Sequence, residues 1–165
     1  MTAMEPGTPF DVVIEIPRGS RNKYTVDHAT GAVMLERTMW TASRYPIDYG
    51  FIPGTLGQDG DPMDALVILD EPAFPGCHVR CRAVAMLHME DQAGGDDKIL
   101  AVPTWDRARP WDGVRDIPRT TREEIEHFFE VYKDLDPGSF SRVRGWRGRT
   151  AAERALEQAF KRHGR

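Results

Sequence analysis

The sequence predicts an α+β fold, in which a small barrel or sheet of short strands is flanked by helices. Short segments with the alternating or continuous apolar pattern of strands occupy the chain up to about residue 102. The segments with helical apolar spacing follow them, towards the C-terminal end. Strands followed by helices, rather than alternating with them, are typical of this class. A chain of 165 residues corresponds to about one domain with a substantial core.

The first strands are predicted near the N-terminus. Residues 1–9 have no strand or helix pattern, and we treat residues 1–8 as a loose arm of a single domain that spans residues 1–165. Residues 10–16 alternate Val and Ile with polar positions and predict a strand. Residues 23–26 and 32–35 flank a turn-rich connection and predict a β-hairpin.

Three further strands are predicted from apolar runs. Residues 65–69 form a continuous apolar run that is typical of a buried strand, and residues 79–89 and 98–102 predict two more. The polar and aromatic cluster at residues 45–50 can offer phenol donors to a site, and no strand is assigned to it.

Two helices are predicted in the C-terminal third. Thr120-x-x-Glu123 and Thr121-x-x-Glu124 are overlapping capping-box candidates that precede an apolar stripe with helical spacing. Thr150-x-x-Glu153 is a third such candidate, and it opens the C-terminal helix.

Composition and charge exclude several functions. The net charge is −4, which gives no general attraction to nucleic acid or to an anionic membrane. No apolar run approaches the length of a membrane-spanning helix, and the N-terminus lacks the pattern of a secretion signal, so we expect a cytoplasmic protein. Cys77 and Cys81 lie about 13 Å apart on an extended segment, too far for a disulfide, and we expect both thiols to be reduced.

The most informative feature is the crowding of three aspartates in Asp59-Gly60-Asp61-Pro62-Met63-Asp64. Two carboxylates about 6 Å apart repel each other by roughly 3 kcal/mol at an effective dielectric constant of 20. An acidic cluster that leads directly into a buried strand therefore indicates a site for a divalent cation, since Mg²⁺ and Ca²⁺ prefer oxygen ligands. The alternative is a solvated acidic turn, which a single D-G-D would favour.

A second acidic turn, residues 91–97, lies between the strands predicted at 79–89 and 98–102. If both turns face one pocket, their aspartates can bind more than one Mg²⁺, and paired metals favour phosphoryl displacement. Lysine and arginine side chains near strand and helix ends would complete the site. The sequence contains no P-loop motif, so a nucleotide bound in that manner is not expected.

These motifs, taken together and in this order, resemble the soluble family I inorganic pyrophosphatases of the shorter bacterial, actinobacterial type. The resemblance runs from about residue 10 to about residue 146. The matching motifs are Glu15-Ile16-Pro17, Arg21-Asn22-Lys23-Tyr24, Tyr45-Pro46-x-Asp48-Tyr49-Gly50-Phe51, Asp59-Gly60-Asp61-Pro62-x-Asp64, Gly94-x-Asp96-x-Lys98, Val102-Pro103, His127-Phe128-Phe129 and Tyr132-Lys133-Asp134-Leu135.

The resemblance implies a five-stranded, OB-like closed β-barrel flanked by helices, with a C-terminal helix, that assembles as a homo-oligomer, typically a hexamer. It implies hydrolysis of pyrophosphate to two phosphates with several Mg²⁺ ions in each active site. Asp61 matches the residue that takes the proton from the attacking water, and Asp96 competes for this role.

The resemblance also assigns the remaining site residues. The positions that bind metal, or line the same cavity as the metals, are Glu15, Asp59, Asp64, Asp91 and Asp96. The positions that bind phosphate oxygens are Lys23, Arg37, Tyr49, Lys98, Tyr132 and Lys133.

The sequence departs from the family pattern at two positions. Thr25 stands where the family usually has Glu, and Gln92 stands where many members have an acid. We expect Thr25 to weaken one metal position or to slow turnover, without abolishing activity. His28 matches a cavity-facing histidine of actinobacterial members, although a lone histidine after a strand is more often structural.

The sequence also leaves open a phosphatase that acts on another diphosphate, and two functions of different kinds. One is a degenerate pyrophosphatase that binds Mg²⁺ and pyrophosphate without turnover, which only Thr25 and Gln92 favour. The other is a nucleic-acid-binding barrel, whose contact strip would be the basic segment around Trp146; a solvated or subunit-contacting segment is the alternative reading of these residues. Acids at the strand ends argue against nucleic acid.

Overall fold

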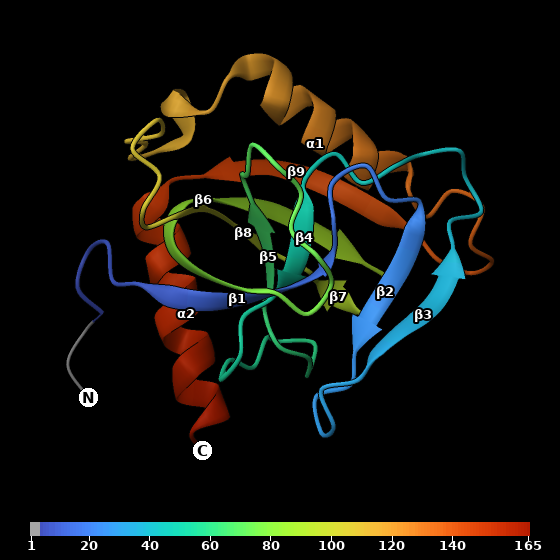
Figure 1. Cartoon of the computed structure of the whole chain (residues 1–165), viewed down its shortest axis with the longest axis horizontal. Coiled ribbons are helices and arrows are strands. Elements are labelled where there is room, and N and C mark those ends of the chain that lie inside the picture. The colour runs from blue at the N-terminus through green and yellow to red at the C-terminus, as the bar shows by residue number, and fades with distance from the viewer. Residues whose placement is uncertain (1–3) are drawn as a thin grey trace.

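Five strands form a ring at the centre of the protein in the computed structural model, which describes residues 4–165 (Figure 1). The ring consists of β1 (Phe10–Ile16), β4 (Asp48–Phe51), β5 (Asp64–Val67), β8 (Lys98–Pro103) and β6 (His78–Asp91). Each strand pairs with the next, and β6 also pairs with β1, so the ring returns to its start. The predicted α+β fold with an OB-like ring of five strands is confirmed.

The two faces of the ring strands are buried against different helices. In β5, Ala65 and Val67 belong to an apolar core that includes α2 (Arg149–His163), whereas Leu66 belongs to the core beneath α1 (Arg119–Val131). Successive strand residues point to opposite faces, so a strand covered on both sides shows a continuous apolar run. This confirms the buried strand predicted at residues 65–69, although it ends at Val67.

The remaining elements extend this ring. The hairpin of β2 (Asn22–Val26) and β3 (Val33–Thr38) projects from one side of it, as predicted (Figure 1). The short β7 (Gly94–Gly95) pairs with the end of β6, and a 3₁₀ turn, η1 (Val114–Asp116), precedes α1. Strand β9 (Ser141–Arg147) pairs antiparallel with β6 beyond the part of β6 that pairs with β1.

Three strands were not predicted: β4, β9 and the two-residue β7, which lies within the predicted turn at residues 91–97. Residues 48–51 form β4, although their sequence shows no alternating apolar pattern. Because Gly50 has no side chain, the backbone of β4 can lie very close to β1. Residues 141–147, which lie in the basic segment, form β9 with Arg144 and Arg147 exposed. Strands β4 and β9 are recognised only by their pairing with strands that are distant in the sequence.

The predicted capping boxes are wrong, although the helices are present. The N-cap of α1 is Pro118 and that of α2 is Gly148, and neither makes a side-chain capping bond. Thr150 lies inside the first turn of α2, and Glu153 instead lies 3.7 Å from Arg149 and accepts a hydrogen bond from the Gly7 N–H. The start of α2 is therefore held by tertiary contacts, from Arg149 to Asp112 and from Glu153 to Gly7.

The N-terminal arm is described only from residue 4. Residues 1–3 of the predicted loose arm lie outside the described residues. From residue 4 onward the arm contacts α2 through the 2.6 Å hydrogen bond from Gly7 to Glu153. In the described part of the chain, no helix is long and apolar enough to cross a membrane.

Candidate active site

One cavity of about 380 Å³ collects residues from distant parts of the chain. Both predicted acidic turns contribute to it: the first turn with Asp59, Asp61 and Asp64, and the second with Asp91 and Asp96. The rest of the lining comes from the end of β1, the β2–β3 hairpin, Tyr45 and β4, and the residues that follow α1. The predicted site residues that line this cavity are Glu15, Lys23, Tyr49, Asp59, Asp61, Asp64, Asp91, Asp96, Tyr132 and Lys133.

Strand pairing explains why the two acidic turns meet. Strands β5 and β8 are parallel neighbours, and Asp64 is in register with Lys98. The first turn leads into β5 and the second into β8, so both turns lie at the same end of the strands. The β5–β8 pair therefore brings together carboxylates that are about 30 residues apart in the sequence.

Lys98 lies in the wall between the turns and is almost fully buried. Its Nζ donates to Asp64 at 2.9 Å and to Asp96 at 3.1 Å, and it lies over the rings of Tyr49 and Phe129. Burial alone would lower the pKa of Lys98, but the carboxylates of Asp64 and Asp96 outweigh it, so the pKa is well above the usual value. Lys98 is therefore charged.

The buried carboxylates nevertheless outnumber the cations beside them. Desolvation, the leading cause, raises the pKa of Asp96 to about 6. The positive charge of Lys98 lowers this pKa, and the negative charges of Asp64 and Asp91 raise it. Desolvation also raises the pKa values of Asp59 and Glu15, with a further contribution from Asp64 in each case. The cavity is therefore short of positive charge on its acidic side.

Cationic side chains line the same cavity. Lys133 Nζ donates to Asp91 at 3.1 Å, and Lys23 lies 3.9 Å from Glu36. Burial lowers the pKa of Lys23. The carboxylates of the two acidic turns thus form an acidic wall, and the ammonium groups of Lys23 and Lys133 line the same cavity beside carboxylates.

Arg37 is the one predicted phosphate-binding residue that neither lines this cavity nor contacts its acids among the described residues. It is in register with Lys23 across the β2–β3 hairpin, but its guanidinium donates to Asp136 at 2.7 Å and lies over the Trp40 ring.

Two tyrosines supply neutral donors. Tyr49 and Tyr132 are largely buried, and desolvation, the leading cause, raises the pKa of each phenol above the usual value. Both phenols therefore keep their protons near neutral pH and can donate hydrogen bonds to an anion.

The remaining residues singled out in the sequence differ in whether they line this cavity. Asp97 turns away from this cavity: its Oδ1 lies 2.7 Å from His88 Nδ1 and accepts the Met89 N–H. His28 does line the cavity, with its ring against Phe51.

Gln92 lies outside the cavity, and its side-chain oxygen accepts the Phe140 N–H at 3.3 Å. Thr25 is thus the departure from the family pattern that reaches the cavity.

Sequence reasoning missed Glu36 and Asp136, the carboxylates that pair with Lys23 and Arg37. Asp136 follows the last family motif by one residue and Glu36 lies on an exposed strand, so neither carried a local signal. Glu36 is identified by the pairing of β2 with β3, and Asp136 by the contact between the hairpin and the segment after α1.

The acidic side of the cavity fits hard divalent cations. Within residues 4–165, no three His, Cys, Asp or Glu side chains lie close enough together to form a metal site as they stand. The Lys98 ammonium, which contacts Asp64 and Asp96, provides positive charge there. The remaining donors are carboxylate oxygens, the ligands that Mg²⁺ and Ca²⁺ prefer, and their raised pKa values show that cations would stabilise them.

The fold and the site together define an OB-like barrel protein whose cavity combines carboxylates for cations with lysines and tyrosines for an anion. Residues 12–164 match the sequence model of the inorganic pyrophosphatase family. The chain is 57% identical over 154 residues to the inorganic pyrophosphatase of Streptomyces coelicolor, which covers 93% of this chain and 94% of the relative. The chain therefore belongs to the inorganic pyrophosphatase family.

Solved structures agree with this assignment. The inorganic pyrophosphatase of Helicobacter pylori superposes with a TM-score of 0.93 at 38% identity, covering 100% of this chain and 99% of that one. The enzyme of Thermus thermophilus gives a TM-score of 0.92 at 41% identity, covering 99% and 98%. Dependence on a divalent metal goes with the family, in keeping with the carboxylates of this cavity.

Proposed function

We propose that this chain hydrolyses inorganic pyrophosphate to two phosphate ions. The observation that carries the proposal is the single cavity lined by both carboxylates and ammonium groups, in a chain that belongs to the inorganic pyrophosphatase family. Pyrophosphate carries several negative charges, so the carboxylates alone would repel it. A divalent metal on the acidic wall reverses that charge, and the lysines then bind the outer oxygens.

We propose Mg²⁺ as this metal, with several ions in each site. The residues that would hold it are Glu15, Asp59, Asp64, Asp91 and Asp96. When bound, Mg²⁺ offsets charge on the phosphate oxygens and favours ionisation of the attacking water.

Asp61 is the proposed general base. Among residues 4–165 its carboxylate makes no hydrogen bond or ion pair, while its backbone N–H donates to Asp59 at 3.1 Å. The carboxylate of the competing Asp96 is bound to Lys98. In the reaction the water oxygen bonds to one phosphorus, the bond from that phosphorus to the bridging oxygen breaks, and Asp61 takes the proton. The products are two phosphates.

The protein groups that would bind phosphate oxygens are the cations and phenols around the cavity. They are Lys23, Arg37, Tyr49, Lys98, Tyr132 and Lys133. The ammonium groups stabilise charge on the leaving phosphate, and the protonated phenols orient the substrate.

The two alternative functions are not favoured. A degenerate pyrophosphatase without turnover was favoured only by Thr25 and Gln92, and Gln92 does not line the cavity. The nucleic-acid reading required a free basic strip, but Arg144 pairs with Glu90, Arg149 pairs with Asp112, and the Trp146 indole N–H donates to Glu126.

We further propose a homo-oligomer, a hexamer by analogy with the family, in the cytoplasm. Apolar side chains exposed on β3 (Val33, Met34 and Leu35) support association with further copies. Two free cysteines, Cys77 and Cys81, are consistent with a reducing compartment.

Phosphate release from pyrophosphate tests the proposed function. We expect release that requires Mg²⁺, that stops with excess chelator, and that falls by about 10²- to 10⁴-fold in Asp61→Ala, the range typical of a lost general base. Asp11→Ala is the control, because Asp11 pairs with Arg80 away from the cavity. A folded wild-type protein that binds Mg²⁺ but releases no phosphate would contradict the proposal.

A further inference from the structure

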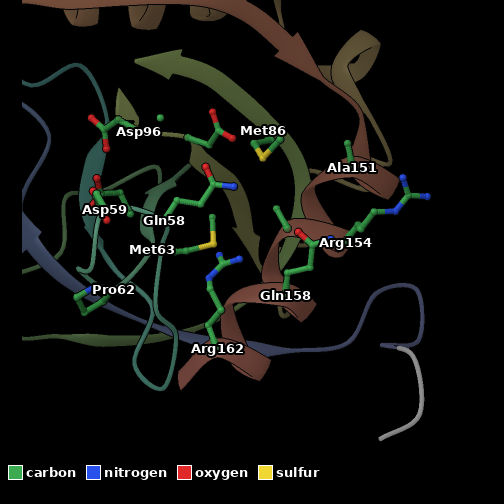
Figure 2. Close-up of a pocket in the computed structure, with 15 residues that line it drawn as sticks. Gln58, Asp59, Pro62, Met63, Met86, Asp96, Ala151, Arg154, Gln158 and Arg162 are labelled. Carbon is green, nitrogen blue, oxygen red and sulfur yellow. The ribbon is translucent and has the colours of Figure 1, made fainter. Parts of the chain in front are cut away.

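A second cavity, of about 250 Å³, lies behind the acidic wall of the active site (Figure 2). Asp59, Asp64 and Asp96 line both cavities, so these carboxylates stand in the wall between them. The far side of the second cavity is formed by α2, which contributes Ala151, Arg154, Ala155, Gln158 and Arg162. The acidic turn is therefore separated from α2 by open space along part of its length.

The acidic turn is held mainly by bonds within itself. The Gly57 N–H donates to the Asp61 carbonyl at 2.7 Å, and the Asp61 N–H donates to the Asp59 carboxylate. The Met63 N–H donates to the Thr55 hydroxyl at the base of the turn. These bonds fix the shape of the turn, but not its position relative to the rest of the protein.

The backbone of one residue, Leu56, attaches the turn to α2. The Leu56 N–H donates to the Ala159 carbonyl at 3.0 Å, and the Leu56 carbonyl accepts from Arg162 Nε at 2.8 Å. Within residues 4–165 these are the hydrogen bonds that join residues 56–62 to another element. The two ends of the turn are fixed by the β4–β5 pairing and by the Ile52 N–H, which donates to the Met63 carbonyl at 2.9 Å. Between these ends, the position of the turn depends on its bonds to the last two turns of α2.

We propose that Arg162 is a positioning residue for the active site, and that its bond to Leu56 holds the acidic turn where Asp59 and Asp61 face the substrate cavity. Arg162 contacts neither the substrate cavity nor its carboxylates in the bonds described. It acts through the backbone of the turn. This inference rests on the proposed function for its kinetic consequences, but its structural consequence does not depend on activity.

Arg154 provides a matched comparison on the same helix. Both arginines line the second cavity, but Arg162 points from α2 towards Met63 and Gln58, whereas Arg154 points away from the acidic turn (Figure 2). Arg154 is exposed, and it makes no hydrogen bond or ion pair within residues 4–165. Changing Arg154 removes the same charge from α2 without detaching the turn.

The experiment compares Arg162→Met with Arg154→Met. Methionine keeps an apolar stem against the helix but donates no hydrogen bond. In Arg162→Met we expect the Mg²⁺ concentration for half-maximal pyrophosphate hydrolysis to rise by about tenfold, as when a group supporting a metal ligand is lost. We expect Arg154→Met to match the wild type. Arg162→Lys, which restores a donor, should recover part of the loss.

Hydrogen exchange of the metal-free proteins gives a second readout. We expect the peptide covering residues 52–63 to exchange faster in Arg162→Met, with unchanged exchange in the β5–β8 pair and no change in Arg154→Met. Wild-type exchange in that peptide, together with an unchanged Mg²⁺ midpoint, would overturn the proposal. Faster exchange in a protein that never hydrolyses pyrophosphate would instead uphold the structural role and reject the proposed function.

Discussion

Cys81 and Cys77 differ in their environment although they are four residues apart. Cys81 is fully buried in the ring, where desolvation, with a smaller contribution from Asp11, raises the pKa of its thiol to about 12. Cys77 lies before β6 and is partly exposed. The thiolate is the reactive form of cysteine, so the two residues should differ sharply towards alkylating reagents.

Alkylation of the native protein at pH 8 tests this difference. We expect iodoacetamide to modify Cys77 and to leave Cys81 unmodified until the protein is unfolded, with mass spectrometry of the peptides as the measurement. The denatured protein, in which both thiols should react, is the control. Equal rates at the two residues in the folded protein would show that the ring opens at β6 far more readily than its packing implies.

Lys98 shows how one side chain can serve both stability and function. Its ammonium is paired with Asp64 and Asp96 and covered by aromatic rings, an arrangement that compensates for its burial. The same pairing keeps two site carboxylates from repelling each other in the absence of metal. Removal of Lys98 would therefore disturb folding as well as the site, which makes it a poor choice for testing catalysis alone.

At the scale of elements, the contact between β1 and β4 depends on Gly50. A Cβ at this position would lie 2.0 Å from the Val13 carbonyl oxygen, within the backbone of the neighbouring strand. No side-chain rotation can relieve such an overlap. Because β4 also carries Tyr49, its pairing with β1 fixes the place of this residue in the lining of the active site.

Gly50→Ala should therefore be strongly destabilising. We expect the free energy of unfolding to fall by about 3 kcal/mol or more, measured by urea denaturation, because two strands must move apart. Gly113→Ala is the matched control, since Gly113 has an extended backbone and a Cβ there meets no atom within 4 Å. An equal, small effect of both changes would show that the β1–β4 spacing adjusts easily.

The β2–β3 hairpin and α2 position the site from opposite sides. The hairpin carries Lys23 and, through Val26, donates a hydrogen bond to Glu15 at 2.9 Å. Helix α2 holds the acidic turn from behind through Leu56. Neither element belongs to the ring, yet both determine where charged groups stand around the cavity.

At the scale of the whole molecule, several large apolar side chains are exposed outside the site. Besides those on β3, they include Trp40, Phe74 and Trp105, each more than half exposed. Scattered apolar residues are ordinary on a surface, but three in succession on β3 favour burial by another chain.

Light scattering after size-exclusion chromatography tests the proposed assembly. We expect a mass close to six times that of the 18.7 kDa chain at micromolar concentration. Met34→Asp places a charge on the exposed face of β3 and should lower the mass if that face is an interface. Glu123→Lys, on the exposed face of α1, serves as a control for a change of surface charge. A monomeric wild-type mass would reject the hexamer.

The sequence by itself determined the class of fold and most of the chemistry of the site. Apolar runs at 10–16 and 65–69 predict strands because burial of a strand leaves a local pattern. The two acidic turns predict a cation site because the crowding of like charges is also visible within a short stretch of sequence. The family motifs then identified the residues around both turns, and ten of those predicted residues line one cavity.

Only the tertiary structure decided which strands pair and which side chains contact each other. β4 and β9 have little apolar pattern and exist through pairing with β1, β5 and β6. Asp136 and Arg162 gained their roles from contacts with residues far away in the sequence. The physical reason is that strand pairing and side-chain contacts join distant segments, and the residues of one segment alone do not specify which partner its backbone and charges will meet.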